Sequence, residues 1–131
     1  MNGYITNIEK VTLENTDFRR VLYTAKYSQL VIMNIKPTED IGEEVHTLDQ
    51  FIRIESGEGK AILDGKEHAI QDDDCIVIPA GTKHNIINTS ASDMKLYTVY
   101  SPPEHLDGTI HTTKEDAIKD DKDEFNGETT E

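Results

Sequence analysis

The fold of this chain is decided by two stretches, GEEVHTLDQ at residues 42–50 and IPAGTKHNIIN at residues 78–88. If the first stretch continues as one strand to its end, the two-residue period of a strand places Glu44, His46 and Gln50 on the same face. The second stretch breaks at a Pro-Ala-Gly turn and then offers one more histidine. Together the two stretches bring four ligand-capable side chains into one interior and indicate a metal site.

Length and charge limit what such a site is built into. A chain of 131 residues with 35% hydrophobic residues is long enough for one domain with one core. The net charge is −13, and residues 115–131 hold eight acids against two lysines. The rest of the chain is acidic as well. A nucleic-acid backbone or an anionic membrane is therefore not expected as a partner, because both need a positive field.

The N-terminus and the cysteine count indicate the compartment. Residues 1–6 lack a basic segment followed by an apolar one, and no apolar run approaches the ~20 residues that span a bilayer. We therefore expect a cytoplasmic protein. Cys75 is the only cysteine, so no disulfide forms within the chain, and its apolar neighbours predict a buried side chain.

Alternation of apolar and polar residues, interrupted by turn residues, predicts an all-β protein. Asp64-Gly65 suits a two-residue hairpin, because both central positions of a type I′ turn need positive φ. Thr113 and the acids after it begin like a capped helix, and beyond that helix the chain is too polar to pack. We expect a β-barrel domain over residues 1–112 and a short helix with a disordered acidic tail over residues 113–131. The predicted strands are residues 18–23, 29–35, 43–48, 50–56, 59–64, 66–70, 74–78, 84–88 and 95–101.

Strand number alone leaves two folds open, an immunoglobulin-like sandwich and a jelly-roll barrel. The first stretch, extended to Gly57, and the second, extended back to Asp74, resemble the two sequence motifs of the cupin superfamily. Residues 17–23, 49–59 and 100–105 are similar to a group of small single-domain bacterial cupins, many of which are labelled mannose-6-phosphate isomerase-like. The resemblance implies a double-stranded β-helix, which is a jelly-roll barrel, and a homodimer.

Matched to the cupin motifs, Glu44 stands where many cupins have a first histidine, and His46 matches the second. Gln50 replaces a glutamate, and His84 matches the last histidine. One imidazole has become a carboxylate and one carboxylate an amide, so the summed ligand charge stays at −1. The resemblance implies a divalent Mn, Fe, Ni or Zn ion on these residues, with Gln50 as a weak fourth ligand or a hydrogen bonder behind it. A metal-free barrel, in which the four side chains bond to one another or to a ligand, stays open.

The fold does not select a reaction, so function is argued from the site. A divalent ion polarises a carbonyl or lowers the pKa of a neighbouring hydroxyl, which suits isomerisation or epimerisation of a small polar molecule such as a sugar. Glu44 is the obvious general base, a role that competes with its role as a ligand. Two alternatives stay open: a metal-free or non-catalytic module that binds a small sugar or carboxylate, and a non-haem iron dioxygenase that uses the same two histidines and carboxylate.

The other histidines and one arginine are predicted to face away from this site. His68 lies in a polar hairpin strand and is expected to face solvent. His105 and His111 follow a diproline and are expected at the surface. By strand parity Arg53 points away from the interior, where it can pair with Glu55 or join a subunit interface.

Overall fold

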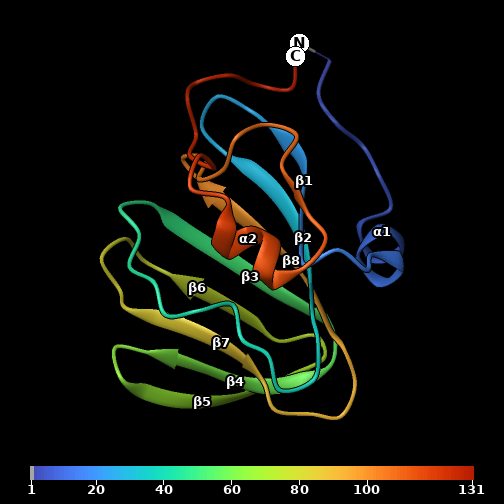
Figure 1. Cartoon of the computed structure of the whole chain (residues 1–131), viewed down its shortest axis with the longest axis vertical. Helices are drawn as coiled ribbons and strands as arrows, with labels where there is room; N and C mark the ends of the chain where they lie inside the picture. Colours follow the sequence, from blue (N-terminus) through green and yellow to red (C-terminus); the bar gives the residue numbers. More distant parts are fainter. Residues whose placement is uncertain (1) are drawn as a thin grey trace.

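The computed structural model describes residues 2–131, which contain nine strands and two short helices (Figure 1). The elements are α1 (Ile8–Glu14), β1 (Arg19–Thr24), β2 (Gln29–Ile35), β3 (Asp49–Ser56), β4 (Glu58–Leu63), β5 (Lys66–Gln71), β6 (Cys75–Ile78), β7 (His84–Asn88), β8 (Met94–Ser101), β9 (Ile110–His111) and α2 (Lys114–Lys119). The strands form a six-stranded antiparallel sheet in the order β6-β3-β8-β2-β1-β9 and a three-stranded one in the order β5-β4-β7. The predicted all-β jelly roll with a short C-terminal helix is confirmed.

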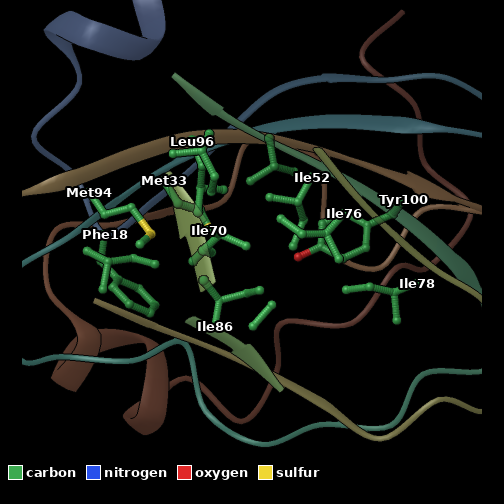
Figure 2. Packing of buried hydrophobic residues seen from close by; sticks show 14 of the residues in the cluster. Phe18, Met33, Ile52, Ile70, Ile76, Ile78, Ile86, Met94, Leu96 and Tyr100 are labelled. Atoms are coloured by element: carbon green, nitrogen blue, oxygen red, sulfur yellow. The ribbon is translucent and has the colours of Figure 1, made fainter. Parts of the chain in front are cut away.

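The core lies between the two sheets (Figure 2). Met33, Ile52 and Leu96 come from the larger sheet and are fully buried. Ile70 and Ile86 come from the smaller sheet and are 6% and 1% exposed. Burial of one such side chain contributes about 1.5–3 kcal/mol. Two apolar inner faces are therefore enough to hold the barrel together.

Two glycine positions show how the turns and the packing depend on the sequence. Asp64 and Gly65 have φ angles of 47° and 82°, which confirms the predicted hairpin between β4 and β5. At Gly59 in β4, an added Cβ atom would lie 2.1 Å from the carbonyl oxygen of Ile87 in β7. The close approach of these two backbones therefore requires glycine at position 59.

The predicted strand over residues 43–48 is wrong. Within it only Glu44 forms an isolated bridge, to His84 in β7, and a second bridge joins Asp40, before the segment, to Ile87 in β7. Gly42 has a φ angle of 115°, which interrupts the extended backbone between the two bridges. The regular strand begins only at residue 49, so strand alternation does not determine how the side chains of residues 44–48 point.

The structure adds two elements that the pattern did not predict. Helix α1 begins at the N-cap Asn7, whose side chain accepts a hydrogen bond from Lys10 N–H at 3.1 Å. Strand β9 has only two residues and pairs with β1, so that His111 lies opposite Arg19. Both elements are too short for a hydrophobic period to mark them.

The C-terminal segment packs against the barrel. Helix α2 begins at the predicted cap, where Thr113 Oγ1 accepts a hydrogen bond from Asp116 N–H at 3.1 Å. Farther on, Phe125 N–H donates to the Glu104 carbonyl, and Asn2 N–H donates to Glu131 Oε1 at 2.8 Å. The C-terminal segment runs over the barrel past α2 (Figure 1). Composition predicts a disordered tail, whereas the structure attaches it through hydrogen bonds, which a count of apolar residues does not register. The domain division at residue 112 stays a prediction.

The outward-facing residues also test the sequence reasoning. Cys75 is exposed, so the prediction of a buried thiol is wrong: β6 is an edge strand that alternates, with Ile76 inward and Cys75 outward. His68 is exposed, as predicted. Arg53 Nε lies 3.6 Å from Glu55 Oε1, which confirms the predicted outward pairing. None of the helices in residues 2–131 is long and apolar enough to cross a bilayer.

Candidate metal centre

Backbone pairing brings the first two candidate ligands together. Glu44 and His84 exchange two backbone hydrogen bonds, each 2.9 Å long. Two residues farther on, the carbonyl of His46 accepts a hydrogen bond from Gly81 N–H at 2.8 Å. The Pro-Ala-Gly turn therefore holds both motifs in register, although the first motif is not a strand.

Three donor atoms converge in this region. One ligand atom each from Glu44, His46 and His84 lies within 4.8 Å of the others. Glu44 Oε2 is 2.8 Å from His46 Nε2, and the rings of the two histidines are 5.0 Å apart between centroids. The 2.8 Å separation has the length of an ion pair, but His46 Nε2 has no hydrogen bond of acceptable direction. The contact is therefore an ion pair by distance without hydrogen-bond alignment, and the two atoms face a common space, as ligands of one cation would.

The tautomer of His84 is set by its surroundings. Its Nδ1 lies 2.9 Å from the carbonyl oxygen of Thr82, and His84 is 5% exposed. A carbonyl oxygen only accepts, so Nδ1 carries a hydrogen, and in the neutral ring Nε2 keeps its lone pair. Metal-binding histidines usually show this arrangement.

Gln50 lies on the interior face of β3. It is 4% exposed, and its Nε2 donates a hydrogen bond to Thr98 Oγ1 at 3.0 Å. Its Oε1 is buried and has no hydrogen-bond partner among the described residues. In the sheet register Gln50 is opposite Tyr100, whose ring lies 5.9 Å from that of His46. The orphaned oxygen is a neutral donor atom on the same side of the barrel as the three ligands.

The charges of Glu44 and His46 are coupled. Burial alone would raise the pKa of Glu44, but contact with His46 and the positive charges of His46, Arg19 and His84 outweigh burial and lower it. Burial alone would lower the pKa of His46, but contact with Glu44 and the charges of Glu44 and Glu104 raise it. Without a metal the two side chains therefore form an ion pair, and a cation would displace the proton of the imidazole.

Residues 31–100 match the family described as the cupin domain. The chain belongs to this family. It is similar to the uncharacterized protein YrkC of Bacillus subtilis, with 44% identity over 122 residues, which is 88% of this chain and 66% of that protein. It is similar to the uncharacterized protein L612 of Acanthamoeba polyphaga mimivirus, with 50% identity over 113 residues, which is 82% of this chain and 70% of that protein. The match thus spans slightly less than two thirds of YrkC.

A solved structure agrees with the fold. The crystal structure of BH2720 from Bacillus halodurans has a TM-score of 0.88 and 42% identity, and the match covers 89% of this chain and 94% of that chain. Agreement over nearly the whole of both chains includes segments outside the matched family region.

The mouth of this cupin barrel holds residues that sequence reasoning missed. A cavity of about 390 Å³ is lined by Arg19, Glu44, His46, Glu104, His105 and Asp123, among others. A second cavity of about 440 Å³ shares His46, Glu104 and Asp123 with it and extends toward Phe125. The tail therefore contributes to the walls of both cavities.

Glu104 is the second carboxylate beside His46. Its Oε2 lies 3.6 Å from His46 Nδ1, on the side of the ring away from Glu44. Burial raises the pKa of Glu104, and the negative charges of Glu44 and Asp123 add to the effect against the lowering charges of His46 and Arg19. In the sequence, Glu104 directly follows the diproline, in a stretch that resembles the bacterial cupins. Its distance along the chain from the other candidate ligands matches no metal-binding motif, so only that resemblance could have indicated it.

The predicted surface positions of His105 and His111 are wrong. The two residues are 6% and 4% exposed. His105 Nδ1 lies 2.6 Å from Asp123 Oδ2, and His111 Nε2 lies 2.9 Å from Asp120 Oδ2. The segment after the diproline returns over the barrel and β9 pairs with β1, so both rings are covered by the tail. Local sequence does not contain this long-range packing.

Proposed function

We propose that this cupin is a metal-dependent enzyme that acts on a small polar molecule, with isomerisation or epimerisation of a sugar-like substrate as the leading reaction. The observation that carries the proposal is the convergence of ligand atoms from Glu44, His46 and His84 within 4.8 Å, beside a cavity of about 390 Å³. A carboxylate and two imidazoles suit a divalent Mn, Fe, Ni or Zn ion.

The donor groups fit such an ion. His84 presents its Nε2 lone pair because Nδ1 donates to a carbonyl, and His46 Nε2 has no partner in line with it. Gln50 offers a buried, unpartnered amide oxygen as a fourth donor. A bound divalent ion would supply polarisation of a carbonyl and a lower pKa for an adjacent hydroxyl.

The site has two carboxylates, so one residue need not serve as both metal ligand and general base. Glu44 is the ligand in this proposal, because its carboxylate lies with the two histidine ligand atoms. Glu104 is the general base, because it lines the cavity and its raised pKa brings it nearer to neutral pH. Glu104 would take a proton from the carbon next to the substrate carbonyl. Return of that proton to the adjacent carbon, together with transfer of the hydroxyl proton to the former carbonyl oxygen, completes an isomerisation. Addition of a proton from water to the opposite face of the same carbon completes an epimerisation.

One observation supports a second candidate, a metal-free binding module. Glu44 and His46 already form an ion pair at 2.8 Å, so the cluster is partly compensated without a metal. The same three ligands also suit a non-haem iron dioxygenase, which would need iron and would consume O₂. A cytoplasmic homodimer belongs to the proposal as well, and light scattering of the purified protein tests the dimer.

Deuterium exchange tests the reaction class. The metal-loaded protein is incubated in D₂O with mannose, fructose, their 6-phosphates and the sugar acid glucuronate, and the C–H signal next to the carbonyl is followed by NMR. The wild type is expected to exchange this hydrogen, and Glu104→Gln is expected to retain metal but to lose exchange. Glu124→Gln is the matched control, since Glu124 lines only the neighbouring cavity. Exchange that persists in Glu104→Gln would exclude this base. Metal retention without exchange, or O₂ uptake with bound iron, would exclude the isomerase.

A further inference from the structure

Arg19 is a buried cation without an anionic partner. It is 7% exposed, and no carboxylate of residues 2–131 lies within 4.0 Å of its guanidinium. Its Nη1 lies 3.2 Å from His111 Nδ1, and its Nε is buried without a hydrogen-bond partner. His111 Nε2 faces Asp120 at 2.9 Å, so His111 Nδ1 is the acceptor of a neutral ring. The guanidinium is therefore held by a neutral group rather than by a counter-ion.

Such an arrangement is costly unless an anion completes it. Buried charges are normally paired, because removal from water penalises an isolated ion. The planar guanidinium fork matches the geometry of a carboxylate and binds it through charge-assisted hydrogen bonds. Arg19 also lines the cavity that contains Glu44, His46 and Glu104. The missing anion is thus expected inside the candidate active site.

We propose that Arg19 binds the carboxylate of the ligand, which makes the substrate class small hydroxy- or oxo-carboxylic acids, including sugar acids, rather than neutral sugars. The inference rests on the proposed function only for the binding of the rest of the ligand near Glu44, His46 and His84. The acids around Arg19 limit the charge of the ligand. Glu44, Glu104, Asp120 and Asp123 line the same cavity, which favours a monoanion over a phosphate dianion.

His105 supplies a second unpartnered atom in the same wall. Its Nδ1 lies 2.6 Å from Asp123 Oδ2 and donates to it, while its Nε2 is buried and unpartnered. Burial lowers the pKa of His105 despite Asp123, so the ring is neutral and Nε2 accepts. An acceptor in the same cavity wall as the cationic Arg19 suits a molecule that carries a hydroxyl as well as a carboxylate.

A structural role for Arg19 makes a different prediction. In that case Arg19 would balance Glu44, Glu104 and Asp123 at longer range, as its effect on their pKa values indicates. Arg19→Gln would then lower the unfolding midpoint of the ligand-free protein. A ligand-binding arginine predicts an unchanged or higher midpoint, because the substitution removes an unpaired buried charge.

The test compares acids with their neutral amides. Glycolate, lactate and gluconate are titrated by calorimetry against the full chain, each beside its amide, with metal loaded and after chelation. At least one acid is expected to bind about tenfold to a hundredfold more tightly than its amide, the range for hydrogen bonds to a charged group. Arg19→Gln is expected to remove this preference. Arg20→Gln, which changes the exposed neighbour in β1, is expected to keep it.

The outcomes separate the two proposals. The inference is overturned if no acid binds better than its amide to the wild type, a comparison that does not depend on any variant folding. It is also overturned if the preference survives in Arg19→Gln. If the protein retains no metal but still prefers acids to amides, the proposed metal-dependent function is wrong and the carboxylate site at Arg19 is supported. If the protein retains metal but does not prefer acids to amides, the metal centre is supported and the carboxylate site at Arg19 is wrong.

Discussion

Asp123 is the residue that most firmly attaches the tail to the barrel. Its side chain is 7% exposed, and its carboxylate accepts hydrogen bonds from His105 Nδ1 at 2.6 Å and Leu106 N–H at 3.0 Å. Thr109 Oγ1 also lies 3.2 Å from this carboxylate but shares its one hydrogen with the Leu106 carbonyl at 2.8 Å. A hydrogen bond to a charged group contributes about 1.5–3 kcal/mol. Because the adjacent cavity admits water to the freed groups, we take the lower value for each of the two hydrogen bonds from His105 and Leu106 and expect Asp123→Ala to reduce the free energy of unfolding by about 3 kcal/mol.

Thermal and urea unfolding measure this loss. For a chain of this size, 3 kcal/mol corresponds to a fall in Tm of roughly 10 °C. Asp121→Ala is the matched control, because it removes the same charge from the same segment and no hydrogen bond of the Asp121 side chain is found within residues 2–131. If the two substitutions lower Tm equally, the hydrogen bonds of Asp123 do not attach the tail to the barrel.

Three further predictions concern pH, packing and the fourth ligand. Hydrogen bonding to His105 lowers the pKa of Asp123 against the raising effect of burial, so its stabilisation is complete above the unfolded pKa of about 4 and is lost as the pH falls through the lower folded value. The stability difference between wild type and Asp123→Ala should therefore be constant from pH 7 to pH 5 and shrink below about pH 4. Gly59→Ala places a Cβ atom 2.1 Å from the Ile87 carbonyl oxygen and should destabilise the fold by about 3 kcal/mol or more in urea unfolding. Gln50→Ala should weaken metal binding in a competition titration by about tenfold to a hundredfold.

Each of these predictions has a contradicting result. A stability difference that changes between pH 5 and pH 7 would assign the effect to protonation of His105 instead of Asp123. Gly65→Ala is the packing control, since no atom lies within 4 Å of its added Cβ and only its φ of 82° opposes alanine, at about 1–2 kcal/mol. A loss as large as that of Gly59→Ala would contradict the clash. Metal affinity unchanged by Gln50→Ala would exclude Gln50 as a donor.

The parts of the fold that depend on local chemistry were predictable from the sequence. The turn at Asp64 and Gly65 and the helix cap at Thr113 follow from residue types in adjacent positions, and both are present. The inward and outward directions on β3 follow from alternation, which placed Arg53 correctly. The prediction of a buried Cys75 was wrong because its apolar neighbours suggested a strand buried on both faces, whereas β6 lies at a sheet edge.

The candidate site was only partly predictable. Glu44, His46 and His84 do come together, but through an isolated bridge and a turn rather than through the strand that the two-residue period assumed. Arg19 and Glu104 carry no spacing signal, because they reach the cavity from opposite ends of the sequence. Which residues close the mouth of the barrel depends on how the C-terminal segment returns over it, and no local pattern encodes that path.

The metal content of the purified protein tests whether Glu44, His46 and His84 bind a divalent ion. The purified, untagged protein is analysed for bound elements beside the double variant His46→Ala/His84→Ala, with the exposed His68→Ala as a control. We expect nearly one Mn, Fe, Ni or Zn ion per chain in the wild type and in His68→Ala, and its loss in the double variant. Less than about a tenth of an ion per chain in all three, even after metal is added back, would contradict the proposed metal centre.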